Sequence, residues 1–235
     1  MVDSVKGQTI SIPNENGLAS ALALLTSEQK EVGSLVVDLG SGTTEYVVYA
    51  NGIIKHTGVL AVGGDHVSND LAYGLKVPLS RAEKLKIEFG SALVNEETRG
   101  QTISLTNELG LELKRINLEH LQRIMSLRLE EIFELIAQDL ERVGLAEYLR
   151  AGVLLCGGGA RVPGLVKLAE NVFQMNVTAG HTCSVSGVTA ALDQPEFAAG
   201  IGLVKFGSLK TRHREGRSFL PRGLKDMFGK LIQRS

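Results

Sequence analysis

The alternation of apolar and polar positions predicts three successive strands early in the chain. Residues 34–40, 44–52 and 53–63 are short apolar or alternating runs, separated by Gly, Asn and Ser. Asn51 and Gly52 join the second run to the third, and both tolerate positive φ, so these two runs are expected to form a hairpin. A fourth strand is predicted at residues 151–156, directly before three glycines.

Helical spacing of apolar residues predicts helices between and after these strands. One is expected at residues 17–30, two more at 65–76 and 78–90, and the longest at 117–144. Residues 91–116 are predicted to be short strands and turns. The long helix carries an apolar stripe typical of packing on a sheet: Leu118, Leu121, Ile124, Met125, Leu129, Ile132, Leu135 and Ile136.

Composition fits a soluble, turn-rich α/β protein, with 235 residues, 43% hydrophobic residues and 27 glycines. The net charge of −1 gives no global attraction to nucleic acid, so no nucleic-acid partner is expected. From Lys205 to Ser235, however, nine Lys and Arg oppose two acids, a net charge of +7. Two distant cysteines, Cys156 and Cys183, favour a reduced, cytosolic setting.

Two glycine-rich loops follow predicted strands and are candidates for phosphate binding. In "DLGSGTT" (residues 38–44), the backbone N–H groups of Gly40, Ser41, Gly42 and Thr43 can fan toward phosphate oxygens, and the Thr43 hydroxyl can add a donor. In "LLCGGGARVPG" (residues 154–164), Gly157, Gly158 and Gly159 precede a helix, whose N-terminus favours anions. Each loop alone could equally be a tight turn.

Together the two loops resemble the actin-like ATPase superfamily, because they occur in this order about 115 residues apart. The segments "VGGDHVSNDLAYGL", "AEKLK", "LRLEEIFELI", "GGGARVPGL" and "PEFAAGIGLVKFG" narrow the resemblance to the FtsA family of bacterial cell-division proteins. The resemblance runs from about Gly17 to the end of the chain. It implies an α/β, actin-like (ribonuclease H-like) domain with a mixed sheet, an inserted smaller α+β subdomain and a C-terminal amphipathic helix.

The resemblance implies ATP or ADP as ligand, with magnesium. Asp38 would orient magnesium-bound water, as a hard oxygen ligand suits that ion; capping of its own turn is the alternative. The implied nucleotide-binding residues are Asp38, Gly40, Ser41, Gly42, Thr43, Thr44, Gly63, Gly64, Glu83, Lys86, Gly157, Gly158, Gly159 and Arg161. Gly63 and Gly64 would contact phosphate or ribose, Glu83 and Lys86 ribose and adenine, and Arg161 would stack over adenine. A surface ion pair is the alternative for Glu83 and Lys86.

Two positions depart from the family pattern. Glu45 stands where most relatives have Asp, which puts any magnesium or water-ordering role there in question. Gly17 stands where proline is usual. The chain resembles the second domain of the family alone, without the first phosphate loop, so ATP hydrolysis is expected to be absent or very slow.

The implied organisation has five parts. Residues 1–33 contain a connecting helix, residues 34–63 and 151–206 form the nucleotide-binding subdomain, residues 64–150 form the inserted subdomain, and residues 207–216 form a linker. Residues 217–235 have helical apolar spacing flanked by basic residues and are expected to bind anionic lipid. The expected membrane-binding residues are Leu224, Lys225, Met227, Phe228, Leu231 and Ile232. Docking on its own domain or in a partner's groove is the alternative.

The resemblance predicts an adaptor that tethers FtsZ filaments to the inner face of the cytoplasmic membrane at the division site. The FtsZ C-terminal peptide would bind the inserted subdomain, with Arg128 among its contacts; a solvated helix face is the alternative. Self-association is left open. The alternative function is an ATPase or filament module of another actin-like type, MreB-like or PilM-like.

Overall fold

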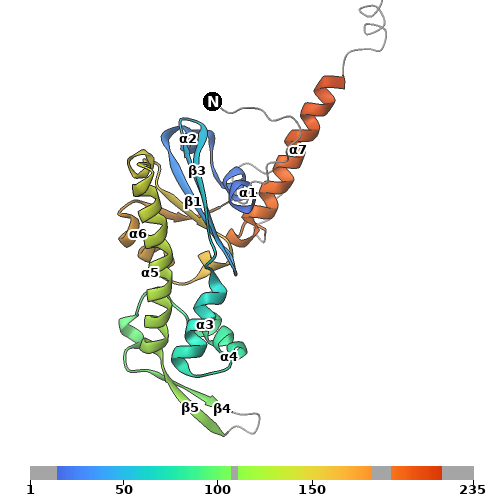
Figure 1. Ribbon diagram of the computed structural model, residues 1–235. Coiled ribbons are helices and arrows are strands. Elements are labelled where there is room, and N and C mark those ends of the chain that lie inside the picture. The colour runs from blue at the N-terminus through green and yellow to red at the C-terminus, as the bar shows by residue number, and fades with distance from the viewer. Residues whose placement is uncertain (1–14, 107–110, 182–191, 219–235) are drawn as a thin grey trace, which may run out of the picture.

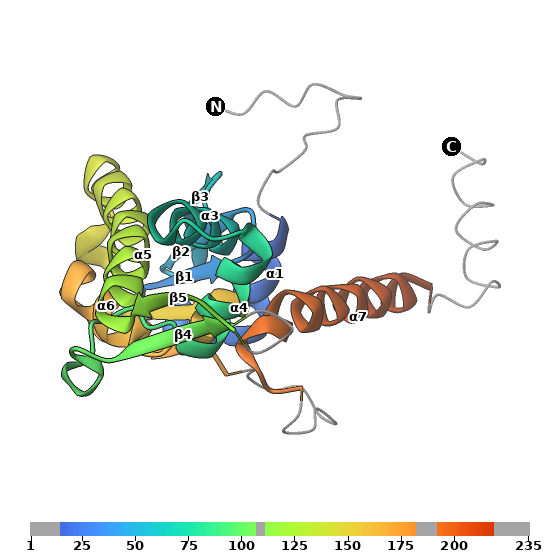
Figure 2. The same ribbon diagram turned by 90° about the horizontal axis from the view of Figure 1, so that it is seen from below.

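The computed structural model describes residues 15–106, 111–181 and 192–218, with side chains described as far as residue 208. Figures 1 and 2 show a central sheet between two helical layers, and in Figure 1 a smaller lobe lies below the sheet. The strands are β1 (Ser34–Leu39), β2 (Thr44–Ala50), β3 (Ile53–Leu60), β4 (Thr102–Thr106), β5 (Glu112–Asn117), β6 (Val153–Cys156) and β7 (Val177–Ala179). The α-helices are α1 (Glu15–Leu24), α2 (Ser27–Val32), α3 (Gly64–Leu75), α4 (Leu79–Phe89), α5 (Leu118–Arg142), α6 (Leu165–Phe173) and α7 (Ala198–Ser218).

The main sheet is mixed, with strand order β3-β2-β1-β6-β7. Strands β1, β2 and β3 pair antiparallel, whereas β6 and β7 run parallel to β1. The predicted β2–β3 hairpin is confirmed, because Asn51 and Gly52 have φ of 55° and 73° at its turn. The mixed sheet and helical layers confirm the predicted α/β class.

Alternate residues of β1 pack on opposite sides of the sheet, since successive strand side chains point to opposite faces. Leu35, Val37 and Leu39 belong to a large apolar cluster that includes residues of α3, α5 and α6. Val36 belongs to a second cluster with α1 and the start of α7. Asp38 shares the parity of Val36 and therefore lies on the α1 side.

The smaller lobe contains α3, α4 and the β4–β5 hairpin, and α5 extends along both lobes (Figure 1). The predicted stripe of α5 is largely buried, but Ile124 is only partly buried and Leu135 is 38% exposed. Phe133 and Leu140, which were not assigned to the stripe, are buried. The buried face of α5 is therefore wider than the predicted stripe and continues to the C-terminal end of the helix.

Two predictions of local structure were wrong. The helix expected at residues 17–30 is split into α1 and α2, because Thr26 caps α2: its hydroxyl accepts from the Gln29 N–H at 3.1 Å, and the Gln29 side chain accepts from the Thr26 N–H at 3.0 Å. The linker expected at residues 207–216 is instead helical, since α7 continues to Ser218. Leu, Lys, Arg and Glu in this stretch favour helix, and it contains no proline.

Candidate functional site

The two glycine loops lie side by side at one end of the sheet. Strands β1 and β6 are parallel neighbours in which Asp38 is opposite Cys156, so residues 40–43 and 157–159 leave the sheet at the same edge. The first loop is closed by a hydrogen bond from the Gly40 N–H to the Thr43 carbonyl at 2.9 Å. Parallel pairing thus brings together the two segments that the sequence analysis linked only by resemblance.

The N-terminus of α3 is hydrogen-bonded to the first loop. The Gly64 N–H donates to the Gly40 carbonyl at 3.0 Å, and the Asp65 N–H donates to the Ser41 carbonyl at 2.8 Å. A Cβ atom on Gly63 would lie 2.6 Å from the Ser41 oxygen, which explains why glycine occupies this position. Gly63 and Gly64 therefore support the loop through their backbone as well as lining the cavity described next.

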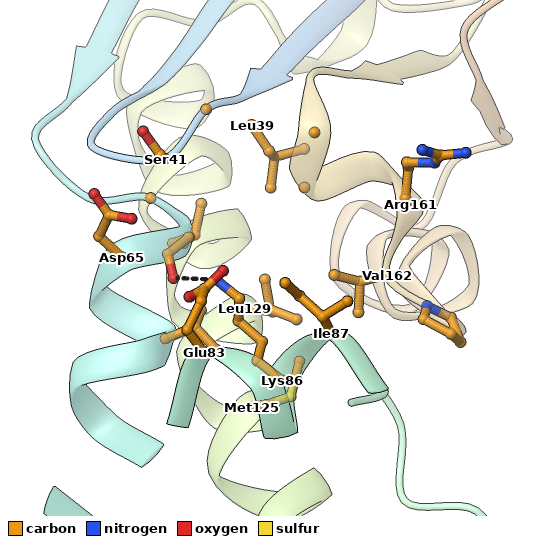
Figure 3. A pocket seen from close by; sticks show the side chains of 18 residues that line it. Leu39, Ser41, Asp65, Glu83, Lys86, Ile87, Met125, Leu129, Arg161 and Val162 are labelled. Carbon is orange, nitrogen blue, oxygen red and sulfur yellow. Dashed lines mark hydrogen bonds and ion pairs between the residues drawn. The ribbon is translucent and has the colours of Figure 1, made fainter. Parts of the chain in front are cut away.

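A cavity of about 380 Å³ opens between the two loops, α3, α4 and α5 (Figure 3). Its lining residues are Leu39, Gly40, Ser41, Gly63, Gly64, Asp65, Val67, Glu83, Lys86, Ile87, Met125, Leu129, Ile132, Gly158, Gly159, Arg161, Val162 and Pro163. Nine of the predicted nucleotide-binding residues are among them. The apolar members were missed because Met125, Leu129 and Ile132 fit a core stripe equally well.

Glu83 and Lys86, one helical turn apart on α4, form an ion pair at the edge of the cavity. The Lys86 Nζ lies 2.7 Å from Oε2 of Glu83 and donates to the Gly64 carbonyl at 3.0 Å. Oε2 also accepts from the Ser68 hydroxyl. Burial alone would raise the pKa of Glu83, but the bonds from Lys86 and Ser68 outweigh it, so its pKa is lowered. Glu83 is therefore an ionised acceptor.

A second cavity of about 180 Å³ lies beside the first and shares Gly40 and Gly158 with it. Its acidic lining residues are Asp38, Glu45 and Glu196, and Thr43 lines it too. Carboxylate and hydroxyl oxygens are the donors that magnesium prefers, so this chemistry fits a magnesium–phosphate group. Among the described residues, no three His, Cys, Asp or Glu side chains are arranged to hold a metal ion directly, so a magnesium ion here would need phosphate and water oxygens as its other ligands.

Two carboxylates of this second cavity, Asp38 and Glu45, are also hydrogen-bonded to α1. Ser20 donates to Asp38 at 2.5 Å, and the Gly17 N–H donates to Glu45 at 2.9 Å. Burial raises the pKa of Asp38, against the hydrogen bond from Ser20. Glu45, which departs from the family pattern, is thus hydrogen-bonded to the first turn of α1, where a negative charge is favourable.

The three glycines of the second loop have different roles. Gly157 has φ of +80°, and a Cβ atom there would lie 2.4 Å from Oδ1 of Asp38. A Cβ atom on Gly159 would lie 2.7 Å from the Cβ of Leu39. At Gly158 a Cβ atom would meet nothing within 4 Å. Backbone packing against the end of β1 requires the outer two glycines, and only Gly158 has free space, between the cavities.

Three predicted site residues lie differently from expectation. Thr44 is buried, and its hydroxyl donates to the Val62 carbonyl at 2.8 Å, so it holds β2 to the chain after β3 and lines neither cavity. Gly42 is exposed and lines neither cavity. Arg161 lines the larger cavity, but its guanidinium pairs with Glu196 at 2.9 Å and points away from Glu83 and Lys86 (Figure 3).

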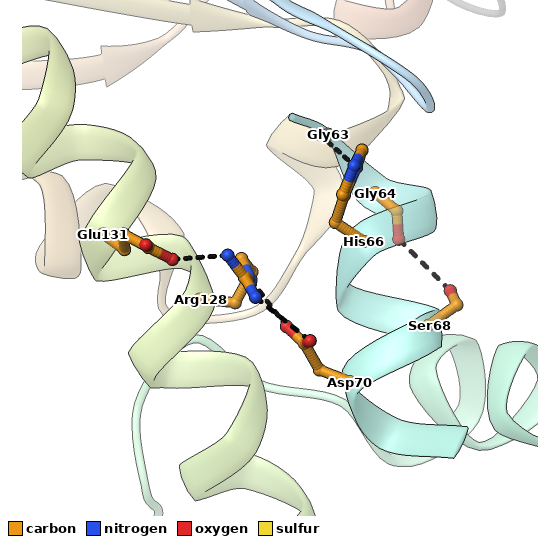
Figure 4. Close-up of polar contacts among 7 residues, drawn as sticks. All are labelled: Gly63, Gly64, His66, Ser68, Asp70, Arg128 and Glu131. Carbon is orange, nitrogen blue, oxygen red and sulfur yellow. Dashed lines mark hydrogen bonds and ion pairs between the residues drawn. The ribbon is translucent and has the colours of Figure 1, made fainter. Parts of the chain in front are cut away.

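Arg128 connects α5 to α3 (Figure 4). Its Nε lies 2.5 Å and its Nη2 3.1 Å from the two carboxylate oxygens of Asp70, and its Nη1 lies 2.5 Å from Glu131. The side chain is 27% exposed. The residue expected to hold a partner peptide is therefore already paired with two carboxylates of its own chain.

The predicted membrane-binding residues, Leu224 to Ile232, lie outside the described residues. Within the described ranges, no helix is both long and apolar enough to cross a membrane.

Comparison with known proteins places the chain among bacterial division proteins. Residues 35–202 match the model of the family described as "Cell division protein FtsA". The FtsA proteins of Pseudomonas aeruginosa and Escherichia coli are 36% and 29% identical, over 82% and 93% of this chain. These matches cover 46% and 53% of the two relatives, so the chain spans about half of their length.

Solved structures agree on the fold. MreB5 of Spiroplasma citri bound to ADP superimposes with a TM-score of 0.69 at 22% identity, covering 89% of this chain and 63% of that one. The PilM–PilN type IV pilus biogenesis complex gives a TM-score of 0.57 at 18% identity, covering 85% of this chain and 52% of that one. These similarities confirm the predicted actin-like fold.

Proposed function

The chain belongs to the FtsA family of cell-division proteins, and on that premise we propose that it binds adenine nucleotide and tethers FtsZ filaments to the inner face of the cytoplasmic membrane. The observation that carries the nucleotide part is the pair of adjoining cavities that meet at Gly40 and Gly158. The MreB5 structures were solved with ADP and with AMPPNP, which supports the same class of ligand.

In this proposal the phosphates lie where the two glycine loops meet. Ser41 and Gly158 approach them, Glu83 and Lys86 face the nucleoside, and the apolar side chains of Ile87 and Met125 cover the base. Asp38 would hold magnesium-bound water, and magnesium would supply positive charge to the phosphate oxygens. A nearby magnesium ion would also favour the ionised form of Asp38, because a cation stabilises the charge of a buried carboxylate.

Calorimetric titration with ATP tests this part. We expect weak binding of ATP that requires magnesium, so EDTA should abolish it. GTP is the comparison ligand and should bind less tightly than ATP. ATP hydrolysis at tens per minute by this chain would contradict the proposal of a non-catalytic adaptor.

Membrane tethering is proposed for residues 217–235, on sequence alone. Burial of Leu224, Met227, Phe228 and their neighbours contributes about 1.5–3 kcal/mol for each fully buried side chain, and the basic residues add attraction to anionic headgroups that salt weakens. Phe228→Glu should abolish flotation with vesicles containing phosphatidylglycerol. Gln233→Glu adds the same charge beside the apolar stripe and should retain most flotation. Equal flotation of Phe228→Glu and the parent would exclude this helix as the anchor.

FtsZ binding is proposed for the inserted lobe, with Arg128 on its border. Because Arg128 already pairs with Asp70 and Glu131, a peptide carboxylate would join an existing network. Arg128→Glu should weaken binding of an FtsZ C-terminal peptide, measured by fluorescence anisotropy. Arg150→Glu should not, because Arg150, although the last residue of the predicted insert, lies beside the main sheet, where the next residue donates to the Gly33 carbonyl. An unchanged affinity for Arg128→Glu would remove this residue from the peptide site.

A further inference from the structure

We propose that Ser68 is a positioning residue that makes the larger cavity selective for ribose. Its hydroxyl would hold Glu83 so that one carboxylate oxygen faces the sugar hydroxyls of a bound nucleotide. The inference rests on the proposed nucleotide binding and on the ribose contact that the family resemblance implies for Glu83, and it adds the residue that positions Glu83.

The geometry at Glu83 leaves its two oxygens unequal. Oε2 accepts from both Ser68 and Lys86. Within the described part of the chain, no hydrogen bond reaches Oε1, although Glu83 lines the cavity and its side chain is 42% exposed. An ionised carboxylate can only accept, so Oε1 suits a donor on the ligand, and the vicinal hydroxyls of ribose are such donors.

Ser68 is placed to fix this arrangement from the neighbouring helix. It lies on α3, is 2% exposed, and also approaches the Gly64 carbonyl at 3.2 Å. A hydroxyl has one proton, so the shorter contact to Glu83 is its hydrogen bond, and the carbonyl of Gly64 is the alternative acceptor. The buried serine thus restricts the rotamer of a side chain whose other end is in the cavity.

Lys86 alone would not hold Glu83 in this position. Its ammonium group is anchored on the Gly64 carbonyl, but the flexible stem lets it keep its contact with the carboxylate while Glu83 changes rotamer. Ser68 has a short side chain on a buried helix face, so it sets the position of Oε2 and thereby that of Oε1. Removing the hydroxyl should free Glu83 to turn with Lys86 toward solvent.

The test compares ATP with 2′,3′-dideoxy-ATP, which lacks both sugar hydroxyls. The parent chain should bind ATP about tenfold more tightly, because a site built around a hydroxyl rejects the analogue without it. Ser68→Ala should weaken ATP binding by about fivefold to tenfold and change the affinity for the dideoxy analogue less than twofold. The ratio of the two affinities should therefore fall toward one. Ser68→Thr, which keeps the hydroxyl, should restore the ratio.

Controls separate this effect from a general loss of binding. Ser41→Ala in the first glycine loop should weaken both nucleotides equally and leave the ratio unchanged. If Ser68→Ala does not fold, Glu83→Gln provides the same test at a more exposed position. The ratio of the affinities for ATP and the dideoxy analogue should again fall toward one.

Different failures have different meanings. A parent chain that binds ATP and the dideoxy analogue equally, or an equal loss of both in Ser68→Ala, would overturn the inference and leave the proposed function intact. A parent chain that binds neither nucleotide would overturn both.

Discussion

Asp38 and Glu83 are carboxylates on opposite sides of the same candidate site, and their pKa values move in opposite directions. Asp38 lies on the α1 side of the sheet, where burial raises its pKa even though Ser20 donates to it. Glu83 lies across the larger cavity, where Lys86 and Ser68 lower its pKa despite partial burial. The family resemblance implied different ligand roles for the two residues, but the sequence did not predict this difference in pKa.

The difference shows what each side of the site can do before a ligand arrives. Glu83 already has its countercharge, so it can accept hydrogen bonds without another cation. Asp38 has no cation within hydrogen-bonding distance in the described part of the chain, and a buried carboxylate without one resists ionisation. In the proposed function, a magnesium ion bound with phosphate would supply that charge.

The largest effect on stability is expected on the α1 side. Glu45→Ala should cost about 1–3 kcal/mol, because it leaves the Gly17 N–H and the Asn16 amide without their acceptor at the start of α1. Glu83→Ala should cost less than about 1 kcal/mol, since the pair is partly exposed and Ser68 can turn to the Gly64 carbonyl. Denaturant unfolding measures the free energy of unfolding of both variants. Equal losses would contradict the expectation that Glu45 contributes more to stability than Glu83.

Two adjacent glycines sharpen the comparison. Gly157→Ala places a Cβ atom at positive φ against Asp38 and should cost on the order of 1–3 kcal/mol. Gly158→Ala enters open space and should stay within about 0.5 kcal/mol of the parent. Thermal unfolding of the two variants checks this, and the prediction is wrong if Gly158→Ala is the less stable.

A smaller effect should appear in the pH dependence of stability. The folded pKa of Asp38 lies above its ordinary value of 3.8, so the folded protein binds this proton more tightly and its stability should fall as pH rises above about 4. Asp38→Asn removes that loss, so the stability of the variant relative to the parent should increase from pH 4 to pH 7. Denaturant unfolding across this range measures the difference, and parallel pH profiles would contradict the raised pKa.

What could be predicted from the sequence depends on how far apart along the chain the interacting residues lie. The strands predicted at residues 34–40, 44–52, 53–63 and 151–156 and the Asn51-Gly52 turn follow from local spacing, and the structure confirms them. The short strand β7 was not predicted. Thr26 and Gln29 form a capping pair that was visible in the sequence and was overlooked. The bond from Thr44 to Val62 and the bonds from α1 to Asp38 and Glu45 join residues far apart in the chain, so no local pattern could reveal them.

The lining of the cavity shows the same limit. Met125 and Leu129 lie on an apolar stripe whose period fits core packing, and only the position of α5 beside the loops exposes them to a cavity. The sequence left Arg128 as a peptide contact or part of a solvated helix face, whereas its side chain pairs with Asp70 of α3, which is distant in sequence. Periodicity identifies the face of a helix, but the neighbouring elements decide what that face touches.

The most direct test of the central claim, that nucleotide binds where the two cavities meet, is the ATP affinity of Gly158→Leu. The leucine side chain would start in open space, so the fold should survive while the space between the cavities is filled. Gly200→Leu is the matched control, at an exposed position of α7 where a Cβ atom also meets nothing within 4 Å. Calorimetry should show no ATP binding to Gly158→Leu and parental binding to Gly200→Leu. Parental affinity in a folded Gly158→Leu protein would contradict the proposed site.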